Sequence, residues 1–272
     1  MPTVAALTRA CHPEPTLAVT AIAAGLAHGA GAPVGRVAAA FLSGQLITGW
    51  SNDWLDRERD RRSGRSDKPL VSGRVSPAAV GRATVAAAAA CVPLSMGLGR
   101  RAGAAHLLAV GSALSYNAGL KAGPLSFAPY AVSFGLLPHI VALAAPPGRP
   151  APGWATAAGA LLGVGAHLAN ALPDLEDDLA TGVRGLPHRL GRGPATGLMA
   201  GLLLTASGLL AYGPGDPGRT GGAALVAAGG ITAGGLVLAR RPGSRAAFLA
   251  AVAVAVVDVA LLVARGAALS RG

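Results

Sequence analysis

Long stretches with no charged residue, or only one, make up most of this 272-residue chain. A membrane-spanning helix needs roughly 20 mostly apolar residues, so nine such stretches leave room only for short loops. The pattern predicts an all-α integral membrane protein with nine transmembrane helices. It excludes a soluble enzyme with a membrane anchor, because no remaining segment could bury a core, and a spanning β-barrel, whose strands alternate in polarity. The stretches are residues 15–35, 37–52, 83–99, 102–120, 122–148, 150–173, 193–215, 220–239 and 246–264.

The net charge of +11 is spread over the connecting segments, without a recognisable nucleic-acid-binding module. No nucleic-acid partner is therefore predicted. With nine crossings, sixteen of the 23 Lys and Arg residues fall on the side that holds the N-terminus, eight of them between residues 57 and 82. Positive charge near helix ends is retained on the cytoplasmic side. We therefore predict a multi-pass plasma-membrane protein with a cytoplasmic N-terminus and an external C-terminus.

Acidic residues gather in two places. Five of the twelve lie between residues 53 and 67, and four lie between 174 and 178. Each cluster follows an apolar stretch on the predicted cytoplasmic side. Asp258 stands apart, inside the last apolar stretch. An intramembrane acid indicates function by default, and the alternatives are pairing with a polar neighbour or burial as a neutral acid.

The two acidic segments repeat one another at an offset of 118 residues. They share the pattern N-x3-D-x3-D-x2-[ST]-G-x4-P-x3-G-R, which begins at Asn52 and again at Asn170. An internal repeat is a statement about architecture. We predict a single transmembrane domain over 1–272, with repeat halves at about 15–121 and 122–240 and a ninth helix at about 245–265. Four helices per half give both halves the same orientation, so the two acidic segments can meet.

The spacing within each motif places its polar residues on one face. Positions i, i+4 and i+8 of a helix drift by only about 40° per step. Pro173 weakens this argument for the second motif, because proline can break a helix just before Asp174. The first set is Asn52, Asp56 and Asp60, with Asp53 close enough to reach a metal, and the second is Asn170, Asp174 and Asp178.

Facing carboxylates at the mouth of an apolar bundle repel, and unpaired they would protonate or splay apart. Mg2+ resolves the repulsion, since it is held by one or two carboxylates together with substrate phosphates. Two such polar faces, one from each motif, suit two Mg2+ ions that bridge one diphosphate. Charged donors for that diphosphate follow the motifs and the fourth stretch, namely Lys68, Arg189 and Lys121.

These segments resemble the signatures of the UbiA superfamily of intramembrane prenyltransferases. The first is NDWLDRERD followed by DKPLVSG, the second is NALPDLEDD followed by LPHRLG, and SYNAGLK at 115–121 lies between them. The resemblance implies nine transmembrane helices, Mg2+-dependent binding of an isoprenyl diphosphate, and prenyl transfer to an acceptor inside the membrane. In two respects the chain departs from the pattern, since Asp67 stands beside Lys68 where a second basic residue is common, and aromatic residues are only 4%.

The resemblance also implies roles for individual residues. Those implied to bind Mg2+ and diphosphate are Asn52, Asp56, Asp60, Asp174 and Asp178. Asn170, at the start of the second motif, is expected to bind the substrate. Lys68, Lys121 and Arg189 are implied to bind diphosphate, and Tyr116 to lie near the reacting carbon or the diphosphate. Among the histidines, His167 either faces the same cavity or packs in the core, and His12 and His188 are expected at the surface.

Three functions remain open from the sequence. The first is a prenyltransferase acting on an aromatic or other small lipophilic acceptor. The second is a UbiA-type terpene cyclase, against which the low aromatic content counts modestly because carbocation cascades use π faces. The third is a transporter with parallel repeats, whose acids should lie near the bilayer centre instead of at one surface.

The odd helix count can be tested with a topology reporter fused to the C-terminus. We expect an alkaline-phosphatase fusion, active only outside the cytoplasm, to be active, and a green-fluorescent fusion to be dark. A C-terminal reporter that is active only in the cytoplasm would reject the count.

Overall fold

Helices are the only regular secondary structure in the computed structural model, which describes residues 4–238 and 245–269. The long helices are α2 (Pro13–Ala30), α3 (Val34–Arg62), α4 (Pro77–Met96), α5 (Arg100–Asn117), α6 (Ala128–Ala144), α7 (Gly153–Ala171), α10 (Arg192–Tyr212), α11 (Gly218–Leu238) and α12 (Ala246–Ala264). The short ones are α1 (Val4–Ala10), η1 (Leu120–Ala122), α8 (Leu175–Ala180), α9 (Leu186–Leu190) and η2 (Gly266–Ala268). Each apolar stretch of the sequence thus coincides with one long helix; the last residue of the stretch 220–239 lies outside the described residues.

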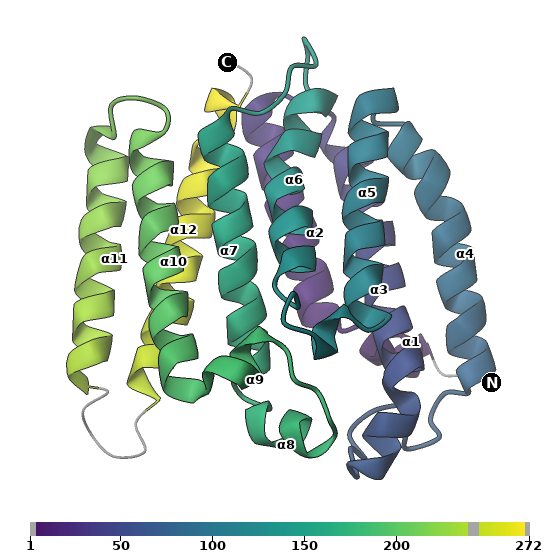
Figure 1. The fold of residues 1–272 in the computed structure, drawn as a ribbon. Helices are drawn as coiled ribbons and strands as arrows, with labels where there is room; N and C mark the ends of the chain where they lie inside the picture. Colours follow the sequence, from purple (N-terminus) through teal and green to yellow (C-terminus); the bar gives the residue numbers. More distant parts are fainter. Residues whose placement is uncertain (1–3, 239–244, 270–272) are drawn as a thin grey trace.

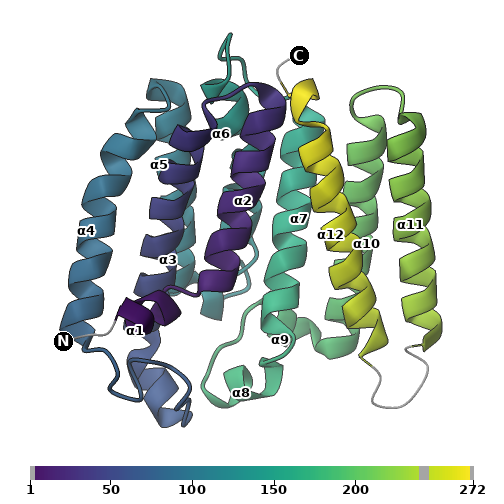
Figure 2. The same ribbon diagram turned by 180° about the vertical axis from the view of Figure 1, so that it is seen from behind.

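The long helices stand side by side, roughly along one common direction (Figure 1). Helix α6 packs against α5 and α7, α10 packs against α7, α11 and α12, and α2 contacts α3, α6 and α12. The short elements α1, α8 and α9 lie at one end of the bundle, and η2 lies at the other (Figure 2). Both acidic motifs therefore sit at the same end, together with α1.

Within the described part of the chain, four helices are long and apolar enough by themselves to cross a membrane, namely α4, α10, α11 and α12. The 17-residue α6 is apolar but shorter, and the remaining long helices are long enough but less apolar. The outer surface of the bundle is also apolar, since Val85, Val226 and Val256 are each at least 65% exposed. Large exposed apolar surface marks contact with a membrane or a partner. The fold is that of a multi-pass membrane protein, and nine crossings stay a prediction.

Small residues let the helices approach closely, as expected where lipid gives helices little hydrophobic reason to associate. A Cβ atom at Gly159 of α7 would lie 2.5 Å from the carbonyl oxygen of Phe134 on α6. One at Gly163 would overlap the carbonyl oxygen of Tyr130, one turn further along. The backbones of α6 and α7 are thus in direct contact beside the acidic end of the bundle.

Asp258 lies on α12 and is fully buried. Its Oδ1 atom is 2.5 Å from the Oγ atom of Ser207 on α10, and this hydroxyl is also 3.0 Å from the carbonyl oxygen of Leu203. Of the sequence-based alternatives, this geometry matches pairing with a polar neighbour. Asp258 links α10 to α12 at a distance from both acidic motifs.

The contact between α6 and α7 can be tested by Gly163→Ala. Adding a Cβ at this position forces the two helices apart, and overpacking of this kind costs about 1–3 kcal/mol. We expect a lower thermal unfolding midpoint in detergent. The matched control is Gly197→Ala on α10, where a Cβ meets nothing within 4 Å; it should be neutral or slightly stabilising because alanine favours helix. Equal midpoints for both variants would contradict the close contact.

Candidate active site

The first acidic motif lies on α3, which continues without interruption to Arg62. Asp53, Asp56 and Asp60 are buried, whereas Trp54 and Glu58 are exposed. An uninterrupted helix gives the shared face that the four-residue spacing predicts. Asn52 is half-buried at the beginning of this face. The acidic face of α3 is thus directed into the protein, and its carboxylates require partners.

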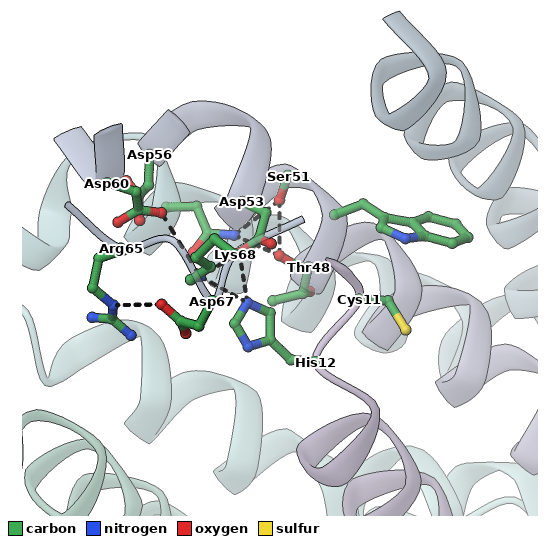
Figure 3. A network of polar contacts seen from close by, with 12 residues as sticks. Cys11, His12, Thr48, Ser51, Asp53, Asp56, Asp60, Arg65, Asp67 and Lys68 are labelled. Atoms are coloured by element: carbon green, nitrogen blue, oxygen red, sulfur yellow. Dashed lines mark hydrogen bonds and ion pairs between the residues drawn. The ribbon is translucent and has the colours of Figure 1, made fainter. Parts of the chain in front are cut away.

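Asp53 receives two such partners from distant segments (Figure 3). Lys68 Nζ lies 2.5 Å from Asp53 Oδ1 and 3.8 Å from Asp60 Oδ2, and His12 Nε2 lies 2.8 Å from Asp53 Oδ1. Burial acts to raise the pKa of Asp53, but the hydrogen bond with His12 and the charge of Lys68 outweigh it and lower that pKa. For Asp60, burial prevails and raises the pKa, helped by the charge of Asp56 and opposed by Lys68.

Asp56 is held between two cations. Lys121 Nζ forms a close ion pair with Asp56 Oδ1, and Arg59 Nη2 lies 2.8 Å from Oδ2. Burial lowers the pKa of Lys121, and the charge of Asp56 opposes that effect. Asn117, the last residue of α5, positions Lys121 by donating to the Thr48 carbonyl and the Ser51 hydroxyl on α3, both at 2.9 Å. The end of α5 is thereby fixed beside α3.

The second motif is not carried by one continuous helix. Helix α7 ends at Ala171, Pro173 and Asp174 lie in the following turn, and Asp178 lies on the six-residue α8. The expected break at Pro173 is therefore present. Asn170 is exposed in the last turn of α7. His188 on α9 brings its Nε2 atom to 3.2 Å from Asp178 Oδ2.

The two motifs end in the same backbone turn. Gly64 and Gly182, offset by 118 residues, have φ angles of 68° and 87°. The next amide in each copy donates to the aspartate five residues earlier, from Arg65 to Asp60 at 3.0 Å and from Val183 to Asp178 at 2.9 Å. This is the glycine-ended helix terminus known as a Schellman motif. The sequence repeat is thus matched by a repeat of local structure.

An ion pair joins the two clusters. Arg65 follows the first motif, and its Nη1 atom lies 3.3 Å from Asp174 Oδ2 of the second. Burial acts to lower the pKa of Arg65, but the charges of Asp174 and Asp67 raise it. Tyr116 on α5 is close enough to interact electrostatically with both Asp56 and Asp178. Carboxylates separated by more than 100 residues in the sequence therefore border one region.

Aromatic rings gather beside this region. The Tyr116 ring contacts those of Tyr130 and His167 edge-on, at centroid distances of 5.2 and 5.6 Å. Phe134 stacks on Tyr130 at 6.2 Å. His167 is buried and lies 2.9 Å from the Ser126 hydroxyl, which also accepts from the Leu186 amide at 2.8 Å. His167 therefore faces the ring cluster and also ties α7 to the segments around η1 and α9.

Some positions differ from expectation. His12 and His188 are expected at the surface. The expectation is wrong for His188, whose side chain is only 3% exposed and contacts Asp178, whereas the His12 side chain is 37% exposed and also contacts Asp53. Arg189 is exposed, and its Nε atom donates to the Arg184 carbonyl at 2.9 Å. Arg59 and Arg65 are additional cations at the site. The only sequence signal for them was their proximity to the first motif.

The carboxylates are paired with cations and are not gathered around a ready-made metal site. Within residues 4–238 and 245–269, no three His, Cys, Asp or Glu side chains come together as a metal centre. One acceptor nevertheless stays free, since Asp53 Oδ2 is buried and has no hydrogen-bond partner among the described residues. Mg2+ is typically held by one or two carboxylates plus phosphate oxygens and water. The donor set therefore fits a magnesium ion that binds together with its phosphate ligand.

Known proteins resemble the chain over nearly all of its length. The model of the UbiA prenyltransferase family matches residues 15–260. A UbiA homolog from Archaeoglobus fulgidus, solved bound to DMAPP and Mg2+, has a TM-score of 0.73 at 19% identity, covering 97% of this chain and 99% of that one. The apo UbiA homolog from Aeropyrum pernix K1 has a TM-score of 0.70 at 21% identity, covering 92% and 98%.

A third structure, concerning digeranylgeranylglyceryl phosphate synthase, has a TM-score of 0.69 at 14% identity and covers 98% of this chain and 99% of that one. No curated protein matches the chain. At these identities the solved structures establish a shared fold.

The buried pair of Lys68 and Asp53 can be tested by Lys68→Met. Removing one partner of a buried ion pair costs about 3–5 kcal/mol, because the other charge stays buried. We expect a large loss of thermal stability in detergent, mostly restored by the double variant Asp53→Asn/Lys68→Met.

The matched control is Arg61→Met, which breaks an exposed ion pair. The Arg61 side chain is 58% exposed and that of its partner Glu58 is 55% exposed. This loss should be about 1 kcal/mol or less. Equal effects of Lys68→Met and Arg61→Met would contradict the burial of the site.

Proposed function

The chain belongs to the UbiA prenyltransferase family, and we propose that it transfers an isoprenyl group from an isoprenyl diphosphate to a small lipophilic or aromatic acceptor within the membrane. The observation that carries this proposal is the ion pair between Arg65 and Asp174, which joins the two acidic motifs at one end of the bundle. One diphosphate between the motifs could then contact carboxylate-bound metal and cations from both. A UbiA homolog from Archaeoglobus fulgidus has been solved bound to GPP and Mg2+ and bound to DMAPP and Mg2+.

The proposal includes the membrane arrangement. Nine helices cross the plasma membrane, α2 to α7 and α10 to α12, as repeat halves at about 15–121 and 122–240 plus a ninth helix at about 245–265. Chain 1–272 is then one domain, with its active site toward the cytoplasm. The matched turns at Gly64 and Gly182 support the repeat. The excess of Lys and Arg at the acidic end supports the orientation.

Each charged residue has a role in holding the diphosphate. The carboxylates of Asp56 and Asp174 would hold Mg2+, together with the carboxylates of Asp53, Asp60 and Asp178 and the side-chain amide oxygen of Asn52, which the motif spacing adds. When bound, Mg2+ supplies positive charge that stabilises the diphosphate as it leaves. Lys68 and Lys121 turn from their carboxylate partners to the diphosphate oxygens, as does Arg65. Asn170 and Arg189, both exposed beside the second motif, can contact the substrate from that side.

The chain also stabilises the allylic cation that forms when the carbon–oxygen bond to the diphosphate ionises. Preorganised charge that stabilises a leaving group is usually the largest catalytic contribution. Tyr116, Tyr130 and His167 present aromatic faces beside the site, where a cation is attracted to the π system. The apolar interior excludes water, which would otherwise quench the cation. A nucleophilic atom of the acceptor forms the new bond to the allylic carbon, and its proton passes to the released diphosphate.

The same ring cluster supports cyclisation as a second candidate. The aromatic residues are few, but Tyr116, Tyr130 and Phe134 are concentrated at one place with His167. A double bond of the substrate could attack the cation there, without an acceptor. Transport is less well supported, because both acidic motifs lie at one end of the bundle and a midplane ion site would need them near its centre.

The proposal is tested by incubating purified protein with Mg2+, isoprenyl diphosphates of several lengths and an acceptor panel, followed by mass spectrometry. We expect a prenylated acceptor and released diphosphate, and no turnover in Asp56→Ala, Asp174→Ala or EDTA. The controls Glu58→Ala and Glu176→Ala remove exposed acids from the same motifs and should keep activity.

A hydrocarbon product formed without acceptor would indicate the cyclase instead. Full activity in both aspartate variants, or activity undiminished in EDTA, would refute the metal assignment. Uptake into vesicles without diphosphate release would favour the transporter.

A further inference from the structure

A groove runs along the outside of the bundle, between the acidic end of α3 and the first half of α4. Its volume is about 610 Å3, within the range of ligand pockets, roughly 300–1,000 Å3. Two arginines and a tryptophan line one part of it, and small apolar residues line the rest. Its lining includes Trp54, Arg57, Gly81, Arg82, Val85 and Ala86.

The polar part of the groove is formed where α3 and α4 meet. The guanidinium of Arg57 lies over the Trp54 ring at 4.6 Å and donates to the Trp54 carbonyl at 2.6 Å. Gly81 lies beside the indole, since a Cβ there would be 3.6 Å from Trp54 Nε1, an ordinary van der Waals distance. Tryptophan is enriched at the membrane–water interface. This part of the groove therefore lies at headgroup depth if the acidic end faces the cytoplasm.

The arginines of the groove have no carboxylate partner. Glu58 is paired with Arg61, and Asp56 is paired with Arg59 and Lys121. Among the described residues, neither Arg57 nor Arg82 forms an ion pair. Two arginines without a carboxylate partner in the lining of one groove favour an anionic ligand. The lining of the groove does not include Asp53, Asp56 or Asp60, so the groove is separate from the candidate active site.

The rest of the groove suits a hydrocarbon chain. Gly81, Val85 and Ala86 follow one another along α4, and Val85 is 70% exposed. The groove follows α4 from Pro77 to Ala89, which at about 1.5 Å per residue is a length of roughly 18 Å. One leaflet contributes about half of the roughly 30 Å hydrocarbon core. The groove therefore has about the length of one leaflet. Arg82 lies about 8 Å along α4 from the Pro77 end, which leaves about 10 Å of the groove beyond Arg82 for a hydrocarbon chain.

We propose that this groove binds an anionic phospholipid of the surrounding leaflet. Arg57 and Arg82 bind its phosphate, the Trp54 indole lies beside the headgroup, and one acyl chain lies along Gly81, Val85 and Ala86. Anionic lipids of the cytoplasmic leaflet are attracted to basic residues at the membrane surface. The site needs no prenyl-transfer activity, so it can be tested independently of the proposed reaction.

The charge contribution is measured by native mass spectrometry of full-length protein in detergent with equal amounts of phosphatidylglycerol and phosphatidylcholine. We expect the wild type to retain phosphatidylglycerol in preference to phosphatidylcholine. The ratio of the two retained lipids should fall by about 5-fold for each arginine that the variant Arg57→Gln/Arg82→Gln removes. The control Arg9→Gln/Arg62→Gln removes two exposed arginines outside the groove, and it should keep the wild-type preference.

The contribution of the groove itself is measured with tryptophan substitutions on α4. Ala86 and Ala90 are both exposed, but only Ala86 lines the groove. Ala86→Trp should displace the acyl chain and abolish retention, whereas Ala90→Trp should leave it unchanged.

Equal retention of the two lipids by the wild type would overturn the proposal. So would an equal loss in the Arg9→Gln/Arg62→Gln control, or full retention in Ala86→Trp.

Discussion

Buried carboxylates at the end of an apolar bundle are the constraint on which the rest of this structure depends. Asp53, Asp56 and Asp60 are each less than 10% exposed, and burying an unpaired charge is strongly unfavourable. Hydrogen-bonding or cationic partners therefore come to α3 from other parts of the chain. His12 comes from the turn before α2, Lys68 from the loop after α3, and Lys121 from η1. The loops at this end are arranged around that requirement.

The same pairing explains how a charged ligand can be accommodated without a preassembled metal centre. Lys68 and Lys121 neutralise Asp53 and Asp56. A diphosphate bound with its metal carries both signs of charge. The carboxylates can then exchange their lysine partners for the metal, and the lysines can exchange their carboxylate partners for phosphate oxygens. The two repeat halves contribute unequally, because α3 is continuous through its motif, whereas the second motif is divided between α7 and α8.

Much of this arrangement could be predicted from the sequence. Charge-free stretches predicted the long helices because only apolar side chains tolerate lipid, and the four-residue spacing predicted the acidic face of α3. Proline chemistry predicted the break at Pro173. Other features depend on tertiary contacts that spacing does not encode. His12 reaches Asp53, 41 residues away, through a left-handed backbone turn with φ of 54° at His12 itself. Arg189 lies near the second motif in sequence, yet it donates to Arg184.

The most direct test of the central claim is a structure of the protein with Mg2+ and a non-reactive isoprenyl thiodiphosphate. The account predicts one diphosphate between the motifs, with an oxygen of Asp56 and an oxygen of Asp174 each about 2.0–2.1 Å from a magnesium ion bound to it. A diphosphate coordinated through carboxylates of a single motif, or bound away from both, would contradict it.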